Sequence, residues 1–330
     1  MLLAAASTVA VPIAKAADRM LGPRGCLFTF HRAAPPDRWS RLPNRNFYID
    51  TAFLDEFLTY LRAGGWQMVT VEEAVRRSAN AESGRYVNFS IDDCYRDSYE
   101  LLAPLFRRHD APLTLYVTTG IPDGTLPLWW AGLEDALLDR DRVCVGEERI
   151  ELASWDDRRA AYHSIASSWD GPDAATHYAA FCRANGIDRE AMHWKHAISW
   201  DMLEELARDP LIEIGAHTIN HPRLSSLDSA TALAELEQSR KRLNARLGLD
   251  VRHFAFPYGR SGDCGPRDFE LARQAGFHSA ATSRKGLVLR GQDQFSLPRN
   301  TINGAHRNLA AMAMHLTGLT GAAARIVGRV

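Results

Sequence analysis

Cysteine, net charge and long apolar runs are all scarce in this sequence of 330 residues. The five cysteines are odd in number, far apart and without a CxxC pair, so they fit a reducing compartment better than a disulfide framework. The formal net charge of -1 gives no indication of a nucleic-acid or membrane partner. Glycine-rich phosphate loops, GxSxG elbows and Ser-His-Asp sets are also absent. The chain has 46% hydrophobic and 24% charged residues. This is the composition of an ordinary globular protein with a large core.

The N-terminal segment is open to two interpretations. Residues 1–14 carry no charge, and the Ala-Lys-Ala that follows resembles a signal-peptide cleavage site. However, no basic region precedes the apolar stretch, and the segment is shorter than the roughly 20 residues that span a bilayer. We therefore expect an N-terminal helical arm over residues 1–24, a cytoplasmic protein and no transmembrane segment. A cleaved signal peptide with a secreted or periplasmic location is the alternative.

Apolar runs of strand length alternate with stretches of helical periodicity along most of the chain. Seven or so such strands predict a parallel sheet, and closure into an α/β barrel over residues 25–330 is the expected form at this length. Between about 128 and 197 the alternation lapses into mainly helical sequence. We interpret this part as an insertion on a barrel loop, because no linker-like stretch brackets it. The last expected elements are short strands around Ala280, Val288 and Phe295 and a helix from near His306.

Two adjacent carboxylates end the most strand-like of these runs, which covers 86–91. Asp92 and Asp93 follow it directly, and the carboxyl ends of parallel strands are where α/β folds place their sites. Successive strand residues point to opposite faces, so both aspartates reach one site only if the chain turns there. The polar residues that follow predict such a turn. The competing interpretation is that Asp93 merely caps the helix that follows.

Two histidines four residues apart end another apolar strand, over 212–216. Pro222 disfavours helical geometry at His221, which places His217 and His221 on a loop leaving the strand. Two imidazoles and one carboxylate form a metal site able to activate water. Alone, such a pair is more often two unrelated histidines, but the Asp-Asp strand end favours a shared site.

A third strand runs into Pro257-Tyr258-Gly259. A sharp turn where the chain leaves the sheet is enough to explain the proline and the glycine. Tyr258 is a candidate for lining a pocket.

These three strand ends resemble the leading motifs of the polysaccharide deacetylases, the NodB-homology or carbohydrate esterase family 4 group. The matching stretches are Ser90–Cys94, His217–His221 and Phe254–Gly259, with further likeness over 27–32 and 95–120. The resemblance implies a distorted (β/α)7 barrel. It also implies metal-dependent removal of N-acetyl groups from an N-acetylated oligo- or polysaccharide.

The resemblance also implies roles for single residues. Asp93, His217 and His221 would hold a divalent metal, usually zinc in this family, with cobalt, nickel or manganese as other possibilities. Asp92 would be the general base. In the branch that deacetylates biofilm poly-N-acetylglucosamine, a histidine like His31 at the end of the first strand is the acid that protonates the departing amine.

Further roles involve the third strand end and a late arginine. The backbone N–H of Tyr258 would help to stabilise the oxyanion. Many members have an arginine just before the Pro-Tyr motif that orients the base, whereas this chain has Phe254 and Phe256 there. Arg299 follows a late strand and is a candidate substitute, because a guanidinium can bind Asp92 bidentately. A surface arginine is the competing interpretation.

Other departures keep competing functions open. Cys94 stands where the family usually has glycine, and the family's late Leu-x-His motif is not recognisable. Together with the missing motif arginine, Cys94 motivates a catalytically silent, glycan-binding barrel as an alternative. Hydrolysis of a non-sugar amide or an O-acetyl ester on the same centre is another. Trp129 and Trp130 are either sugar-stacking residues or part of the core.

Overall fold

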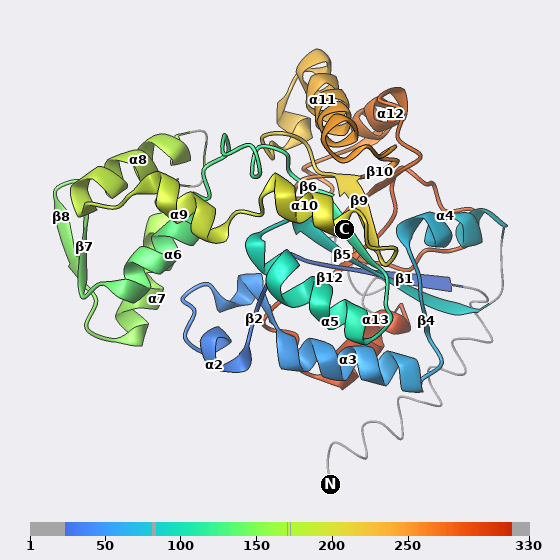
Figure 1. Cartoon of the computed structure of the whole chain (residues 1–330), viewed down its shortest axis with the longest axis horizontal. Coiled ribbons are helices and arrows are strands. Elements are labelled where there is room, and N and C mark those ends of the chain that lie inside the picture. Colours follow the sequence, from blue (N-terminus) through green and yellow to red (C-terminus); the bar gives the residue numbers. More distant parts are fainter. Residues whose placement is uncertain (1–23, 81–83, 170, 172, 319–330) are drawn as a thin grey trace, which may run out of the picture.

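A parallel sheet forms the centre of the molecule in the computed structural model, which describes residues 24–80, 84–169, 171 and 173–318 (Figure 1). The strands of this sheet are β1 (Arg24–Phe30), β4 (Gln67–Met68), β5 (Arg85–Asp93), β6 (Leu113–Val117), β9 (Ile212–Ala216), β10 (His253–Ala255), β11 (Ser279–Ala281) and β12 (Asn300–Thr301). Their order is β11-β10-β9-β6-β5-β1-β12, with β4 paired to the first half of β5. Isolated pairs, Ala281 with Leu297 and Gly25 with Val288, link β11 and β1 to the segment that connects β11 with β12. The sheet therefore curls into the predicted distorted α/β barrel.

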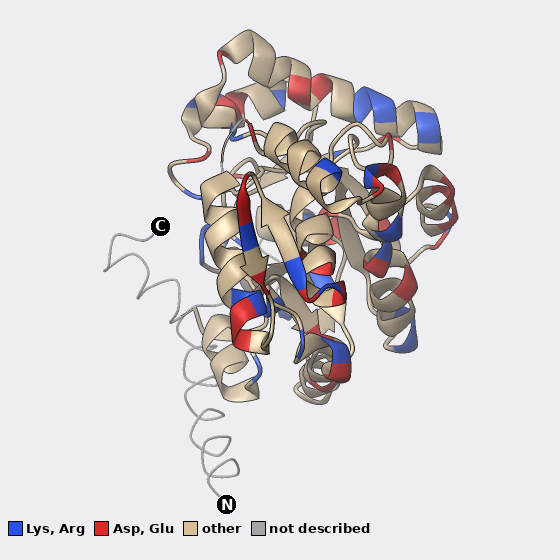
Figure 2. Cartoon of the chain, turned by 90° about the vertical axis from the view of Figure 1, so that its left-hand side faces the viewer, with Lys and Arg blue, Asp and Glu red and all other residues tan. Residues whose placement is uncertain are grey.

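Helices cover the outer face of the curled sheet (Figure 1). They are α3 (Thr51–Ala63), α4 (Val71–Asn80), η2 (Ser98–Leu102), α5 (Ala103–Arg108), α10 (Trp200–Leu206), α11 (Ser229–Leu247), α12 (Pro266–Gln274) and α13 (Leu309–Leu316). The side chains of Asp50, Ser199 and Asp228 accept hydrogen bonds from the first backbone N–H groups of α3, α10 and α11. Such caps stabilise a helix by about 1 kcal/mol each. Acidic and basic residues are interspersed along the helices (Figure 2), in keeping with the low net charge.

A few short elements complete the barrel. They are β2 (Arg32–Ala34), α2 (Pro36–Trp39), η1 (Arg45–Phe47), β3 (Tyr48–Asp50) and η3 (Leu224–Ser226). Strands β2 and β3 pair with each other in parallel, beside the end of β1.

The two faces of β5 differ sharply in chemistry. Val87, Phe89 and Ile91 belong to the main apolar core, where the Phe89 ring stacks on Phe28 with the ring centroids 5.5 Å apart. Burying a side chain such as Phe89 stabilises the fold by about 1.5–3 kcal/mol. The alternate residues include Ser90 and Asp92, which are buried but polar. Because side chains alternate along a strand, the sequence of β5 aims Asp92 into a polar interior and away from the apolar layer.

The predicted insertion is a separate lobe at the left of Figure 1. Its elements are α6 (Trp129–Asp139), β7 (Arg142–Val145), β8 (Glu148–Glu151), α7 (Trp155–Trp169), α8 (Ala174–Asn185) and α9 (Arg189–His196). It has an apolar cluster of its own, in which Trp169 contacts Trp129 and Phe181. Strands β7 and β8 form an antiparallel hairpin that the sequence analysis did not predict.

Several local expectations need correction. Val288 makes only an isolated bridge, no strand forms at Phe295, and the last described helix starts at Leu309 instead of near His306. The expected N-terminal arm lies outside the described residues apart from its last residue, Arg24, which begins β1. Within the described part of the chain, no helix has both the length and the apolar character needed to cross a bilayer.

Candidate active site

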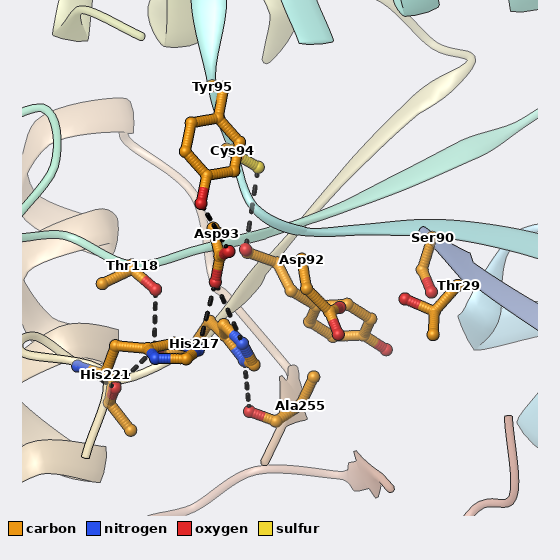
Figure 3. Close-up of polar contacts among 12 residues, drawn as sticks. Thr29, Ser90, Asp92, Asp93, Cys94, Tyr95, Thr118, His217, His221 and Ala255 are labelled. Carbon is orange, nitrogen blue, oxygen red and sulfur yellow. Dashed lines mark hydrogen bonds and ion pairs between the residues drawn. The ribbon is translucent and has the colours of Figure 1, made fainter. Parts of the chain in front are cut away.

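Three side chains that are distant in sequence converge at the carboxyl ends of β5 and β9. Oδ1 of Asp93 lies 3.2 Å from Nε2 of His221 and 3.5 Å from Nε2 of His217. One ligand atom from each of the three residues falls within 4.8 Å of the others. Figure 3 shows the two imidazoles pointing at the same carboxylate. The structure therefore brings the expected ligand set together, with Asp93 and His217 buried and His221 half-buried.

Unusual backbone geometry makes this convergence possible. Six described non-glycine residues have a positive φ, and five of them lie at or just beyond the carboxyl ends of β5, β9 and β10. These five are Asp93, Cys94, Thr218, His221 and Tyr258. At Asp93 (φ 68°) the N–H of Cys94 donates to the carbonyl of Asp92, and at Tyr258 (φ 60°) the N–H of Gly259 donates to the carbonyl of Pro257. A positive φ inside such a three-residue hydrogen bond is the mark of the classic γ-turn, which is rare and strained. The predicted turn after β5 is present, and it lets both aspartates serve one site.

The chemistry of the three residues fits a divalent cation. Nδ1 of His217 lies 2.7 Å from the carbonyl of Ala255, which can only accept, so Nδ1 carries the proton and Nε2 presents its lone pair toward Asp93. Burial lowers the pKa of His217 to about 4, so its ring is neutral at pH 7. Within the described residues, Oδ1 of Asp93 is a buried oxygen that lacks a hydrogen-bond partner. An unpartnered carboxylate oxygen between imidazole nitrogens is a donor set suited to zinc.

Asp93 is ionised in this environment. Burial raises the pKa of its carboxyl group, but the neighbouring imidazole of His221 outweighs burial and brings that pKa well below its usual range. Its other oxygen, Oδ2, accepts a hydrogen bond of 2.8 Å from the hydroxyl of Tyr95. The two oxygens of Asp93 therefore face different partners.

Asp92 is held by Arg299 in a bidentate ion pair. The distances are 2.6 Å from Nη1 to Oδ1 and 2.8 Å from Nη2 to Oδ2. Arg299 is completely buried, which contradicts the competing interpretation of a surface arginine. Its Nη1 also donates to Thr29 and Ser90, and its Nε donates to the carbonyl of Thr282.

The pair with Arg299 determines the charge of Asp92. Burial raises the pKa of the Asp92 carboxyl group, but the charge of Arg299 more than offsets this, so the pKa is below its usual value. Asp92 is therefore an ionised, fixed carboxylate. Phe254 and Phe256, at the place where many relatives have the orienting arginine, are buried in the apolar core.

His31 and Tyr258 lie beside these groups. His31 follows β1, its ring centroid is 4.9 Å from that of Phe47, and its imidazole lies within electrostatic reach of the carboxylates of both aspartates. In the described part of the chain neither ring nitrogen of His31 makes a hydrogen bond. Tyr258 is exposed, with its ring 4.9 Å from that of His221 and the guanidinium of Arg223 4.0 Å above it. All seven side chains singled out from the sequence thus lie at or next to one site.

Sequence reasoning missed the side chains behind the ligands. Tyr95 contacts Asp93, Trp130 contacts Tyr95, and Arg32 lies against the ring of Tyr95. The position of Tyr95, two residues after Asp93 in a turn, was the one available signal. Of the two interpretations given for Trp129, sugar stacking or core packing, the structure shows packing: its ring lies against Trp169, beside the apolar cluster of the insertion.

The chain is an α/β barrel that carries two histidines, a carboxylate and a second, arginine-bound carboxylate at the carboxyl edge of its curled parallel sheet. More specifically, the family model for polysaccharide deacetylase matches residues 79–280, and the chain belongs to this family. The matched range contains Asp92, Asp93, His217, His221 and Tyr258. His31 and Arg299 lie outside it, one on either side.

Solved structures show the same fold. The deacetylase PplD from Streptococcus pyogenes, in complex with acetate, is 17% identical with a TM-score of 0.59, and the alignment covers 88% of this chain and 97% of that one. IcaB from Ammonifex degensii is 20% identical with a TM-score of 0.57, covering 89% and 98%. The deacetylase domain of BpsB from Bordetella bronchiseptica is 14% identical with a TM-score of 0.54, covering 84% and 96%. No curated protein sequence matches the chain.

Proposed function

We propose that this protein is a metal-dependent deacetylase that removes N-acetyl groups from an N-acetylated oligo- or polysaccharide. Membership of the polysaccharide deacetylase family supports hydrolysis of acetyl groups on sugars. The convergence of Asp93, His217 and His221 on one point, with the ionised Asp92 beside them, is the observation that carries the proposal.

In this proposal Asp93, His217 and His221 hold the cation, for which zinc is the first candidate. When bound, the cation supplies Lewis-acid activation of water and of the acetamide carbonyl. The fixed proton on Nδ1 of His217 keeps Nε2 available as a ligand atom. The γ-turn at Asp93 holds its carboxylate at the mouth of the barrel.

Asp92 acts as the general base and takes a proton from the attacking water. Arg299 occupies one position on each of its oxygens, and each oxygen keeps a further lone pair for that proton. The same ion pair fixes the direction of the carboxylate, and such positioning is a large part of general base catalysis. The backbone N–H of Tyr258, in its γ-turn, is the proposed donor to the developing oxyanion.

His31 acts as the general acid and delivers a proton to the departing amine. Its place next to both aspartates supports this role, as does the absence of a hydrogen bond to its ring from any described residue. A ring nitrogen that is not already engaged is able to donate to a substrate atom.

One of the two observations that motivated a catalytically silent, glycan-binding barrel no longer supports it. It rested on Cys94 and on the missing motif arginine, and the contact between Arg299 and Asp92 supplies the arginine from another part of the chain. Cys94 itself adopts the left-handed conformation (φ 68°) that glycine usually provides.

The experiment is amine release from chitooligosaccharides of defined length by protein that has been stripped with a chelator and reloaded with zinc, cobalt, nickel or manganese. We expect amine release that disappears with the chelator and returns with metal. A parallel panel of non-sugar acetamides and O-acetyl esters separates the alternatives. Metal binding without amine release from any acetylated sugar contradicts the proposal.

A further inference from the structure

Tyr95 occupies the side of Asp93 that faces away from the histidines. Its hydroxyl is 2.8 Å from Oδ2, and the side chain is completely buried. Figure 3 shows Tyr95 approaching the carboxylate from the side opposite to the two imidazoles. Because Oδ2 is engaged in this way, the carboxylate is held with Oδ1 toward His217 and His221.

A residue of the insertion donates a hydrogen bond to the same hydroxyl. Nε1 of Trp130, at the start of α6, lies 3.2 Å from the hydroxyl oxygen of Tyr95. An indole N–H can only donate, so the Tyr95 oxygen accepts from it. The single proton of the Tyr95 hydroxyl is then left for Asp93. Trp130 thus orders the hydroxyl even though it does not touch the candidate ligands.

The ring of Tyr95 is held by a second group that joins the barrel to the insertion. The guanidinium carbon of Arg32 lies 4.8 Å from the ring centroid of Tyr95 and 4.8 Å from that of Tyr48. Arg32 is itself fixed by Asp97, at 2.7 Å, and lies 3.1 Å from Nδ1 of His196 in α9. Both α6 and α9 belong to the insertion, so the lobe contacts the support of the candidate metal centre at two points.

We propose that Tyr95 is a positioning residue for the metal centre and that Trp130, by ordering the Tyr95 hydroxyl, makes metal affinity depend on the insertion. The inference rests on the proposed function, because it takes Asp93 as a metal ligand. It assigns a role to an insertion that the candidate chemistry does not otherwise use.

The first test is the affinity of purified Tyr95→Phe for zinc, measured by competition with a chromophoric chelator. The substitution keeps the ring and its packing against Arg32 and Trp130, while removing the hydroxyl together with its hydrogen bonds to Asp93 and Trp130. We expect affinity to fall about 10- to 100-fold, as when other outer partners of metal ligands are removed. Tyr99→Phe is the matched control, because that hydroxyl donates to Glu205 on the exposed surface, and its affinity should equal that of the wild type.

The second test is a double-mutant cycle with Trp130→Phe. Alone, this change removes one neutral hydrogen bond and should weaken zinc binding about twofold to tenfold. In the Tyr95→Phe background it should add nothing, because the hydroxyl through which it acts is gone. Trp155→Phe is the control, since Trp155 lies exposed at the start of α7 in the same insertion, and zinc affinity should not change.

The results separate this inference from the proposed function. Equal zinc affinities in the wild type and Tyr95→Phe, or additive losses in the cycle, overturn the positioning role and leave the deacetylase proposal intact. If the wild-type protein binds zinc but releases no amine, the proposed function is contradicted. The positioning role of Tyr95 can still be tested, because its readout is zinc affinity. Thermal unfolding of each metal-free variant shows whether the fold is retained.

Discussion

Asp92 and Asp93 are identical, adjacent and both ionised, yet the structure surrounds them very differently. Both oxygens of Asp92 bind one buried guanidinium, whereas Asp93 has one oxygen on Tyr95 and the other facing two imidazoles without a hydrogen-bond partner among the described residues. Strand alternation aims Asp92 into the polar interior, and the γ-turn at Asp93 brings its carboxylate to the barrel mouth. Two copies of one side chain thus acquire different chemistry from backbone geometry and partners.

Replacing Asp93 should have the largest effect. We expect Asp93→Ala to lose bound metal and deacetylation together, because it removes the sole carboxylate of the candidate ligand set. Metal content by atomic emission, measured alongside amine release, checks both. Retention of stoichiometric metal in Asp93→Ala would contradict the role given to this residue.

Asp92→Asn should separate the two functions. The amide is nearly isosteric but cannot take a proton, so kcat should fall about 10²- to 10⁴-fold, the usual contribution of a general base. Metal affinity should remain close to that of the wild type. Normal turnover in this variant would remove Asp92 from the mechanism, and loss of metal would show that the two carboxylates are not functionally distinct.

Arg299 supplies the third test, because it contacts only one of the two aspartates. Arg299→Met leaves a buried carboxylate without its partner and should lower the free energy of unfolding by about 3–5 kcal/mol, measured by urea denaturation. Arg299→Lys keeps the charge but cannot bind both oxygens in a fork, so it should be more stable than Arg299→Met and still slower than the wild type. An unchanged kcat in Arg299→Lys would show that bidentate positioning of Asp92 is unimportant.

Cys94→Gly should have the smallest effect. Glycine adopts φ of 68° without the cost of about 1–2 kcal/mol that other residues meet in the left-handed region, but it also removes a buried thiol. These contributions oppose each other, so we expect stability within about 1 kcal/mol of the wild type, and metal affinity and turnover nearly unchanged. A large loss of turnover would instead implicate the thiol in the reaction.

The residues at the strand ends are predictable from the sequence because a parallel sheet brings the carboxyl ends of its strands to one edge. That rule and the likeness of the motifs were enough to predict that four side chains share one site, namely those of Asp92, Asp93, His217 and His221. Arg299 was open between two interpretations, since β12 after it has only two residues and gives almost no strand signal. Here the contact with Asp92 decides between them.

The support behind Asp93 could not be anticipated in the same way. The direction of the Tyr95 side chain depends on positive φ values at Asp93 and Cys94, which an ordinary sequence pattern does not reveal. The contact from Trp130 depends on how the insertion docks against the barrel. The hairpin β7–β8 was missed because Glu148–Glu151 is largely exposed and charged and has no apolar alternation.

The most direct measurement of the contrast between the two aspartates is X-ray absorption spectroscopy of the zinc-loaded protein, compared with zinc-loaded Asp92→Asn. We predict a coordination shell with two imidazole nitrogens and oxygen ligands, unchanged by Asp92→Asn. A shell without two imidazoles, or one that loses an oxygen ligand when Asp92 is replaced, would contradict it.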